Sequence, residues 1–201
     1  MRPGVRRTVV ALALLALSAS TTGCAADPDP SPPAGVDGLT VPSPSPDPDD
    51  FDAAGGGVDN PWLALDPGST TTLEGTDGAV TLAVAEDPTT VGGIEATEVT
   101  FTDPRGSTTA LLAQDDDGNV WRLGDTGAEA GLVMAATPRL GDGYGTTYAG
   151  GAVDARAEVT DLEGDTLEVR WTDRAGTDAL ATFEKGTGLV RLETAFGAYG
   201  R

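Results

Sequence analysis

Short runs of alternating apolar and polar residues recur roughly every ten residues from position 58 to position 201, separated by Gly, Asp and Pro. No run in this region keeps a helical spacing of apolar residues over a useful length. Alternation with a period of two places one face of a strand in a core and the other face in water. The pattern therefore predicts an all-β domain at 58–201, either an antiparallel sandwich or a strongly curved sheet of about nine strands.

The clearest strand pair is Thr166–Thr172 with Ala152–Thr160, joined by a turn that contains Gly164. Apolar residues alternate with charged residues in both segments, so one face of each strand is expected in the core. Trp171 is expected on that buried face. Opposite charges on the outer face are expected to pair across the two strands.

Other segments follow the same alternation. In one of them Ile94 and Ala96 are out of phase with Val99, which indicates a bulge near Glu98. In the last segment, Leu192 and the residue two positions before it, Val190, are expected to be buried. The further strands are predicted at Ala79–Ala85, Ile94–Thr102, Thr108–Gln114, Asn119–Leu123 and Leu189–Thr194.

Residues 1–23 have the layout of a secretory signal: three arginines, an apolar run at 9–17, and then small residues. The apolar run is too short to span a bilayer as a stable helix. The segment ends in Gly23 followed by Cys24, the only cysteine of the chain. This resembles the bacterial lipoprotein signal, in which cleavage precedes a cysteine that carries a diacylglyceryl group.

The resemblance implies cleavage after Gly23 and a lipid anchor on Cys24. The protein is then expected to be exported and held on the outer face of the cytoplasmic membrane. Residues 24–57 are expected to be a disordered tether, because residues 25–57 hold eight of the 14 prolines, seven acids and no cation. A predicted disordered linker thus separates the signal peptide (1–23) from the β-domain.

The chain is strongly acidic, with 12 Lys and Arg against 32 Asp and Glu. Loss of the three arginines of the signal would leave nine cations and a net charge of −23. Such a charge repels phosphate backbones, so no nucleic-acid partner is expected.

The chain contains no histidine, which removes a Ser-His-Asp triad, a histidine base and a histidine-ligated zinc site. The predicted anchor also occupies the one thiol. We therefore expect no enzyme and no cofactor. A carboxylate-based hydrolase is the remaining catalytic alternative, and it would require two acids facing each other across a cleft at about 5–10 Å.

One stretch has part of a calcium-loop pattern. Asp115, Asp117 and Asn119 occupy the first, third and fifth positions of such a loop. Val120 replaces the expected glycine, and Thr126 stands where a bidentate Glu is needed. The stretch is therefore predicted to be a polar hairpin turn, with a calcium site as the weaker alternative.

Tyr144 and Tyr148 lie among glycines, where two interpretations remain open. The two rings line a ligand groove, or they pack within an edge strand.

Several stretches together resemble a group of secreted actinobacterial lipoproteins. They are Asn60-Pro61-Trp62 with the following Pro67-Gly68, the segment Gln114–Trp121, Pro138–Asp142 with Tyr144, and Gly186–Val190. The resemblance spans most of residues 59–192. It implies an exported β-domain and supplies no activity and no catalytic residues.

Three functions remain open for such a domain. The leading expectation is a surface that binds a protein or a cell-wall partner. The second is a carrier that holds a lipid or another hydrophobic ligand in a groove of the curved sheet. The third is the carboxylate-based hydrolase. An empty apolar groove would favour the carrier, and a completely filled core would exclude it.

Overall fold

The computed structural model describes residues 47–51, 57–63, 65–124, 129–149 and 152–201. These residues form one short 3-10 helix, η1 (Pro48–Asp50), and 13 strands, so the all-β prediction is confirmed. The strands are β1 (Thr70–Gly75), β2 (Gly78–Val84), β3 (Thr89–Val91), β4 (Ile94–Asp103), β5 (Gly106–Gln114), β6 (Val120–Leu123), β7 (Ala130–Met134), β8 (Gly143–Ala149), β9 (Ala152–Glu163), β10 (Thr166–Asp173), β11 (Asp178–Glu184), β12 (Gly188–Thr194) and β13 (Gly197–Gly200). No helix in these ranges has the length and apolar character needed to span a membrane.

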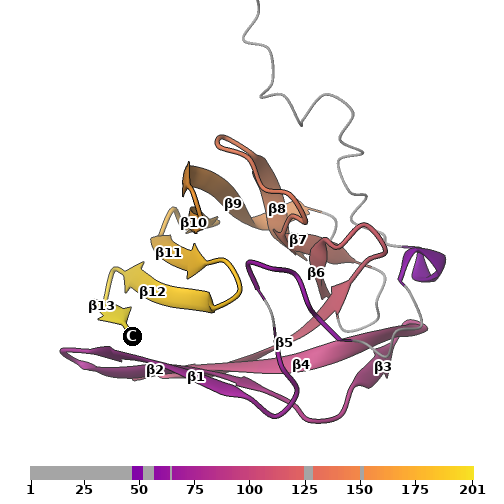
Figure 1. Cartoon of the computed structure of the whole chain (residues 1–201), viewed down its shortest axis with the longest axis horizontal. Helices are drawn as coiled ribbons and strands as arrows, with labels where there is room; N and C mark the ends of the chain where they lie inside the picture. The colour runs from indigo at the N-terminus through magenta and orange to yellow at the C-terminus, as the bar shows by residue number, and fades with distance from the viewer. Residues whose placement is uncertain (1–46, 52–56, 64, 125–128, 150–151) are drawn as a thin grey trace, which may run out of the picture. The chain divides into compact units, whose positions relative to one another are not determined.

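The strands form one antiparallel sheet with the order β7-β6-β5-β4-β2-β1-β13-β12-β11-β10-β9-β8, and β3 pairs with β4 outside this path (Figure 1). The first and last strands of this order, β7 and β8, contact each other. The sheet is therefore strongly curved and nearly closes on itself, which removes most of its exposed edges. The described ranges hold more strands than the nine expected, because short strands such as β3 and β13 carry little periodic signal.

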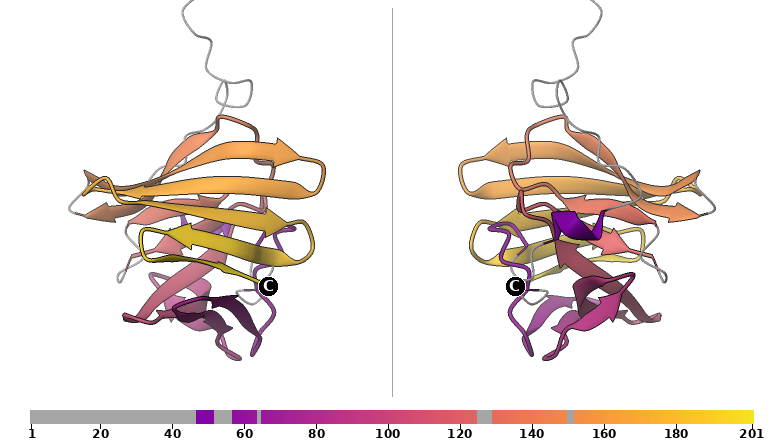
Figure 2. Two further views of the ribbon diagram at one scale, coloured as in Figure 1. Left: turned by 90° about the vertical axis from the view of Figure 1, so that its left-hand side faces the viewer. Right: turned by 90° about the vertical axis from the view of Figure 1, so that its right-hand side faces the viewer.

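The sheet narrows where β1 meets β13. Their described pairing consists of Glu74 with Gly200 and Gly75 with Tyr199. On one side of this junction, β8–β13 lie next to one another as a layer, as Figure 2 shows. On the other side, β1, β2 and β4–β7 form the second layer, and the two layers face each other across the interior.

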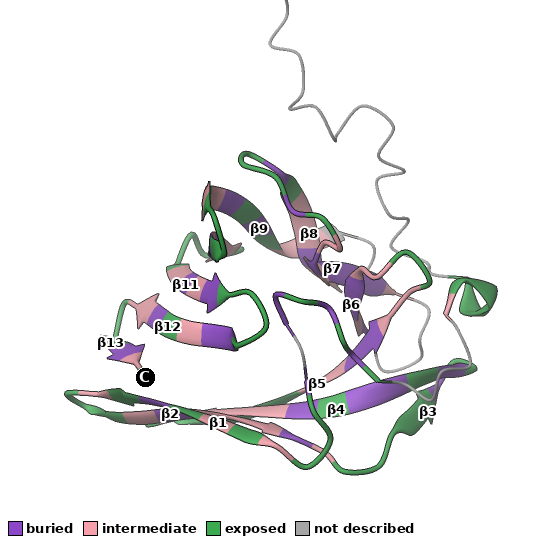
Figure 3. Cartoon of the chain, in the orientation of Figure 1, coloured by how far each residue is buried: buried purple, intermediate pink, exposed green. Residues whose placement is uncertain are grey.

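The interior is filled by an inner cluster of apolar side chains from both layers. Its most deeply buried members come from β1, β2, β6, β7 and β9–β11. Figure 3 shows buried residues separated by exposed or half-buried ones along β9–β11, whereas β6 and β7 are buried along most of their length. The largest fully buried side chains of the cluster are Leu73, Val80, Val120, Met134, Val159, Leu167, Val169 and Phe183.

An outer cluster lies on the opposite face of β4–β7, and it corrects the prediction of a bulge near Glu98. Strand β4 pairs with β5 from Thr97 to Asp103 without a register shift. Ile94 and Ala96 belong to the outer cluster, whereas Val99 belongs to the inner cluster. The phase change in the sequence thus arises because both faces of this strand are buried. The outer cluster comprises Val91, Ile94, Ala96, Ala113, Trp121, Leu123, Ala130 and Leu132.

A bulge in β12 corrects a second prediction. The pairing of β11 with β12 shifts between Thr182 and Phe183, so Thr182 pairs with Arg191 and Phe183 pairs with Leu189. Val190 is the extra residue and is only half-buried, while Leu189 is buried. Because a bulge turns the strand by one residue, Leu189 and Leu192 reach the core from the same side.

The predicted hairpin of β9 and β10 is confirmed, with Thr166 paired to Glu163 across Gly164 and Asp165. Gly164 has φ 59°, a conformation that favours glycine. Arg170 and Glu158 pair across the two strands at 4.0 Å, as expected from their charges. Both side chains are exposed, so this ion pair contributes little to stability.

The segment Asp47–Phe51, assigned to the tether, packs on the outside of the sheet. The backbone N–H of Asp116 donates to the carbonyl of Asp50 at 2.9 Å. The ring of Phe51 is half-buried against the outer cluster. At this stretch the chain is therefore docked on the domain instead of being disordered, and the outer cluster is covered in part by residues that precede the predicted domain boundary.

Candidate functional site

One end of the sheet's interior is filled by the segment that precedes β1. Val58, Trp62, Leu63 and Leu65 are buried in the inner cluster, and we call the described residues 57–63 and 65 the plug segment. The N–H of Gly186, in the turn between β11 and β12, donates to the carbonyl of Pro61 at 2.6 Å. The plug segment is therefore fixed to the layer formed by β8–β13, beside β12 in Figure 1.

Asn60 fixes the plug segment to the other layer. Its side chain is 1% exposed, and its Nδ2 donates to the carbonyls of Gly118 (2.9 Å) and Ala135 (3.2 Å). Its Oδ1 accepts from the backbone N–H groups of Trp62 (2.9 Å) and Leu63 (3.3 Å). A buried amide with every partner in place is costly to replace, so Asn60 has a structural role.

The other part of the interior is not filled, and a pocket of about 400 Å³ opens between the two layers. This volume lies within the range of small-molecule sites, roughly 300–1,000 Å³. We call it the inner pocket. Three threonines and one arginine are its polar or charged members, and no Asp or Glu lines it. Its walls are Leu82, Val99, Phe101, Thr108, Ala110, Leu112, Arg122, Val133, Thr146, Thr147, Ala155 and Trp171.

Trp171 forms one wall of the inner pocket. Its ring packs edge-on against Phe183, with ring centroids 5.9 Å apart and an interplanar angle of 87°. The residue is half-buried and packs against the inner cluster from its margin. The alternation of β10 predicted correctly that Trp171 faces the core, and the ring is only half-buried because it lines the open inner pocket.

Arg122 is the charged residue of the inner pocket. On β6, Val120 belongs to the inner cluster, and Trp121 and Leu123 belong to the outer cluster. Strict alternation along the strand therefore directs Arg122 inward. Sequence reasoning missed this residue, because the sequence Val-Trp-Arg-Leu of β6 is apolar on both faces and does not indicate which face is the interior.

Arg122 differs from every other described cation. The structure describes nine Lys and Arg residues, and eight of them are exposed. Arg122 alone among these nine is half-buried. No side chain in the described ranges pairs with its guanidinium. Among the described residues, the mostly apolar wall of the inner pocket thus holds one positive charge that no side chain pairs with.

Two threonines of β8 lie beside Arg122 because the strand is bulged. The pairing of β8 with β9 shifts between Gly145 and Thr147, which leaves Thr146 as the extra residue. A bulge re-aims side chains, so the consecutive residues Thr146 and Thr147 both line the inner pocket.

The approach of β8 to β7 depends on Gly131. A Cβ atom at this position would lie 2.2 Å from the carbonyl carbon and oxygen of Thr146. Only a residue without a side chain permits this contact. Gly131 therefore closes the sheet beside the inner pocket.

A smaller polar pocket of about 240 Å³ adjoins the inner pocket. Arg122, Thr146 and Thr147 line both, so these residues form the shared wall. Tyr148 and Glu129 line the polar pocket only. Of the two tyrosines considered as ligand-facing, Tyr148 therefore lies at a cavity next to the apolar one.

Tyr144 has a packing role instead. Its ring contacts both the inner and the outer cluster, and its hydroxyl lies 3.5 Å from the carbonyl of Val133. Burial raises the pKa of Tyr144 above its usual value of 10.0, and the negative charge of Asp142 adds to this effect. The residue lines none of the pockets described here.

The loop with the partial calcium pattern is organised as a turn. Asp115 Oδ1 accepts from the N–H of Asn119 (2.8 Å), and Asp115 Oδ2 accepts from Trp121 Nε1 (2.7 Å). The Oδ1 of Asn119 accepts from the N–H of Ala136 (2.9 Å). These oxygens would be needed for a cation, and they are held by N–H donors. Within the described ranges no group of three or more acidic or thiol side chains is arranged as a metal site. Asp117, the third residue of the calcium pattern, therefore belongs to no such group.

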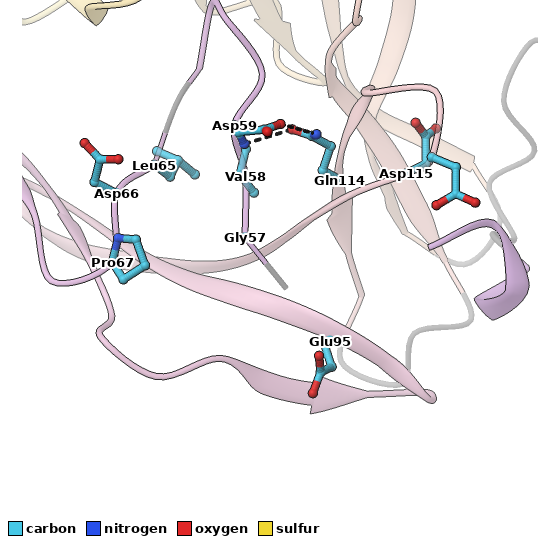
Figure 4. Close-up of a pocket in the computed structure, with 10 residues that line it drawn as sticks. Gly57, Val58, Asp59, Leu65, Asp66, Pro67, Glu95, Gln114 and Asp115 are labelled. Carbon is cyan, nitrogen blue, oxygen red and sulfur yellow. Dashed lines mark hydrogen bonds between the residues drawn. The ribbon is translucent and has the colours of Figure 1, made fainter. Parts of the chain in front are cut away.

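An acidic pocket of about 530 Å³ lies between the plug segment, β4 and the turn after β5 (Figure 4). Asp59 and Gln114 point toward each other: Gln114 Nε2 donates to Asp59 Oδ1 (2.6 Å), and Asp59 N donates to Gln114 Oε1 (3.0 Å). Five carboxylates line this pocket, from Asp59, Asp66, Glu95, Asp115 and Asp116.

Cys24 and Gly23, the residues of the predicted lipid anchor and cleavage site, lie outside the described ranges. No family model matches the chain, and neither the curated proteins nor the solved structures include a significant match.

Proposed function

We propose that this chain is a lipid-anchored carrier whose β-domain holds a small hydrophobic molecule in the inner pocket. The observation that carries the proposal is an open apolar pocket of about 400 Å³ inside an otherwise filled sheet. Small closed β-sheets either fill their interior with side chains or hold one small ligand. This sheet does both, since the plug segment fills one part and leaves the other open.

The predicted anchor supports the same function. A diacylglyceryl group on Cys24 supplies two chains, which suffices for stable attachment to a membrane. The tether then keeps the domain close to a source of hydrophobic molecules. Replacement of Cys24 by Ala is expected to move the protein from the membrane fraction to the soluble fraction, and retention in the membrane fraction would contradict the anchor.

The pocket itself is tested by filling it. Ala110 lines the inner pocket, whereas its neighbour Thr109 on the same strand is exposed. In Ala110→Phe the added ring is expected to occupy the pocket and to lower binding of the neutral probe N-phenyl-1-naphthylamine by the delipidated full-length protein. Thr109→Phe adds the same ring outside and is expected to bind like the wild type. Equal binding by all three proteins, or no binding by the wild type, would contradict the carrier.

A second candidate is a binding surface for a protein or a cell-wall partner, and the acidic pocket favours a cationic one. The reversal of charge at Asp66 and Asp116 to Lys would weaken such a partner and leave the probe in the inner pocket. The two functions are therefore separable.

A further inference from the structure

We infer that the ligand of the inner pocket is a single-chain amphiphile with a carboxylate head, and that Arg122 holds this head. The inference rests on the proposed function, because it assigns the chemistry of a molecule bound in the same pocket. Three observations lead to it: the charge of the pocket, the position of Arg122 in its wall, and the size of the pocket.

The inner pocket carries a positive charge, whereas the whole protein is strongly negative. The chain carries 32 acids and 12 basic residues, yet no acid lines this pocket and one arginine does. A half-buried guanidinium loses part of its hydration, and an anion that faces it offsets this loss by a charged hydrogen-bonded pair. No side chain of the described ranges supplies that anion, so a ligand that does so gains the full interaction.

The position of Arg122 suits a molecule with a polar head and an apolar tail. The residue forms part of the wall between the apolar inner pocket and the adjoining polar pocket. A head bound at this wall lies beside the hydroxyls of Thr146 and Thr147, while the tail extends toward Phe101 and Trp171. A few polar groups that orient a mostly apolar ligand are the usual arrangement of such sites.

A carboxylate fits better than a phosphate. One guanidinium neutralises one negative charge and binds a carboxylate through two parallel hydrogen bonds. A phosphate monoester carries nearly two charges at pH 7 and would leave one of them unpaired against apolar walls. The volume of about 400 Å³ is near the lower end of the usual range, which favours one chain over two.

The test compares three probes with the same chain length: dodecanoate, dodecan-1-ol and dodecyl phosphate. Binding to the delipidated full-length protein is measured by calorimetry. We expect dodecanoate to bind at least about tenfold more tightly than dodecan-1-ol, because a charged hydrogen-bonded pair is added. We also expect dodecyl phosphate to bind more weakly than dodecanoate.

Arg122→Met keeps an unbranched apolar stem and removes the guanidinium with its charge. This variant is expected to lose about tenfold in affinity for dodecanoate and to keep its affinity for dodecan-1-ol. Arg156→Met is the matched control, because Arg156 is exposed on β9 and lies outside the walls of both pockets. Arg122→Lys keeps the charge without the planar fork and is expected to bind dodecanoate with intermediate affinity.

Three other results of these binding measurements would each contradict one part of the proposal. Equal affinity of wild type for the acid and the alcohol, unchanged in Arg122→Met, removes the role of Arg122 and leaves the carrier intact. Tighter binding of the phosphate removes the carboxylate assignment. Absence of binding for all three probes overturns both the inference and the proposed function. The acid–alcohol comparison needs only the wild type, so it holds even if a variant fails to fold.

Discussion

One end of the sheet's interior is filled by the plug segment, and the other end is open. At one end the plug segment inserts Trp62 and Leu63 among residues from both layers. Asn60 ties the segment to Gly118 and Ala135 with two hydrogen bonds. At the other end the walls are mostly apolar but include Arg122 and three threonines, and no segment of the described chain covers them. A curved sheet of this size therefore has more interior than its own strands fill, and the chain uses one loop to fill only part of it.

The largest expected effect on stability comes from Gly131, where β7 and β8 meet beside the inner pocket. In Gly131→Ala the new Cβ would meet the carbonyl of Thr146 at 2.2 Å, so β7 and β8 must separate. We expect a loss of more than about 3 kcal/mol in the free energy of unfolding, measured by urea titration. Gly143→Ala is the control on β8, because its Cβ would lie 3.8 Å from the carbonyl oxygen of Ala157. A similar cost for both variants would show that the β7–β8 contact is not tight.

The plugged end is tested next through Asn60. Asn60→Ala leaves the carbonyls of Gly118 and Ala135 and the N–H group of Trp62 without their side-chain partner. The N–H group of Leu63 keeps its bond to the backbone carbonyl of residue 60 (3.0 Å). We expect a loss of about 2 kcal/mol in the free energy of unfolding. Gln114→Ala is the matched control, since its amide also binds the plug segment, at Asp59, but in an exposed position. A smaller loss of unfolding free energy than in Gln114→Ala would show that Asn60 is not the main residue that holds the plug segment in place.

The contact of Tyr144 on β8 with Val133 on β7 can be tested by the pH dependence of stability. Its pKa is raised in the folded state, so above about pH 10 the unfolded chain loses this proton while the folded chain keeps it. The contribution is fully present below pH 10 and is lost as the pH rises further, by at most about 1.4 kcal/mol per pH unit. Chemical denaturation at pH 8 and pH 11 should show a smaller decrease for Tyr144→Phe than for the wild type. The same decrease in both would mean that this hydroxyl does not govern the alkaline limit.

The smallest expected effect concerns the outer cluster. Phe51 is half-buried, so Phe51→Ala is expected to lower the free energy of unfolding by about 1 kcal/mol. Binding in the inner pocket should not change, because Phe51 packs on the opposite face of the sheet. A change in probe affinity in Phe51→Ala would show that packing on the outer face of the sheet affects the inner pocket, which would contradict this expectation.

Much of the fold could be predicted from alternation alone, as the β9–β10 hairpin and the turn between β5 and β6 show. The two exceptions have different causes. The pattern of β4 was read as a bulge because both of its faces are buried, and the bulge in β12 was missed because it moves Leu189 into the place expected for Val190. A period-two pattern reports which residues share a side of an isolated strand, and it does not report what the other side contacts.

The sequence by itself determined the all-β class, the positions of most strands, the charge and the absence of histidine chemistry. These properties are local or compositional, so neighbouring residues suffice to establish them. Only the tertiary structure decided that the sheet curves around an inner pocket, that Gly131 admits β8 beside it, and that Arg122 is the half-buried cation in its wall. These features join strands far apart in the chain, and a cavity exists only where no side chain from any of them reaches.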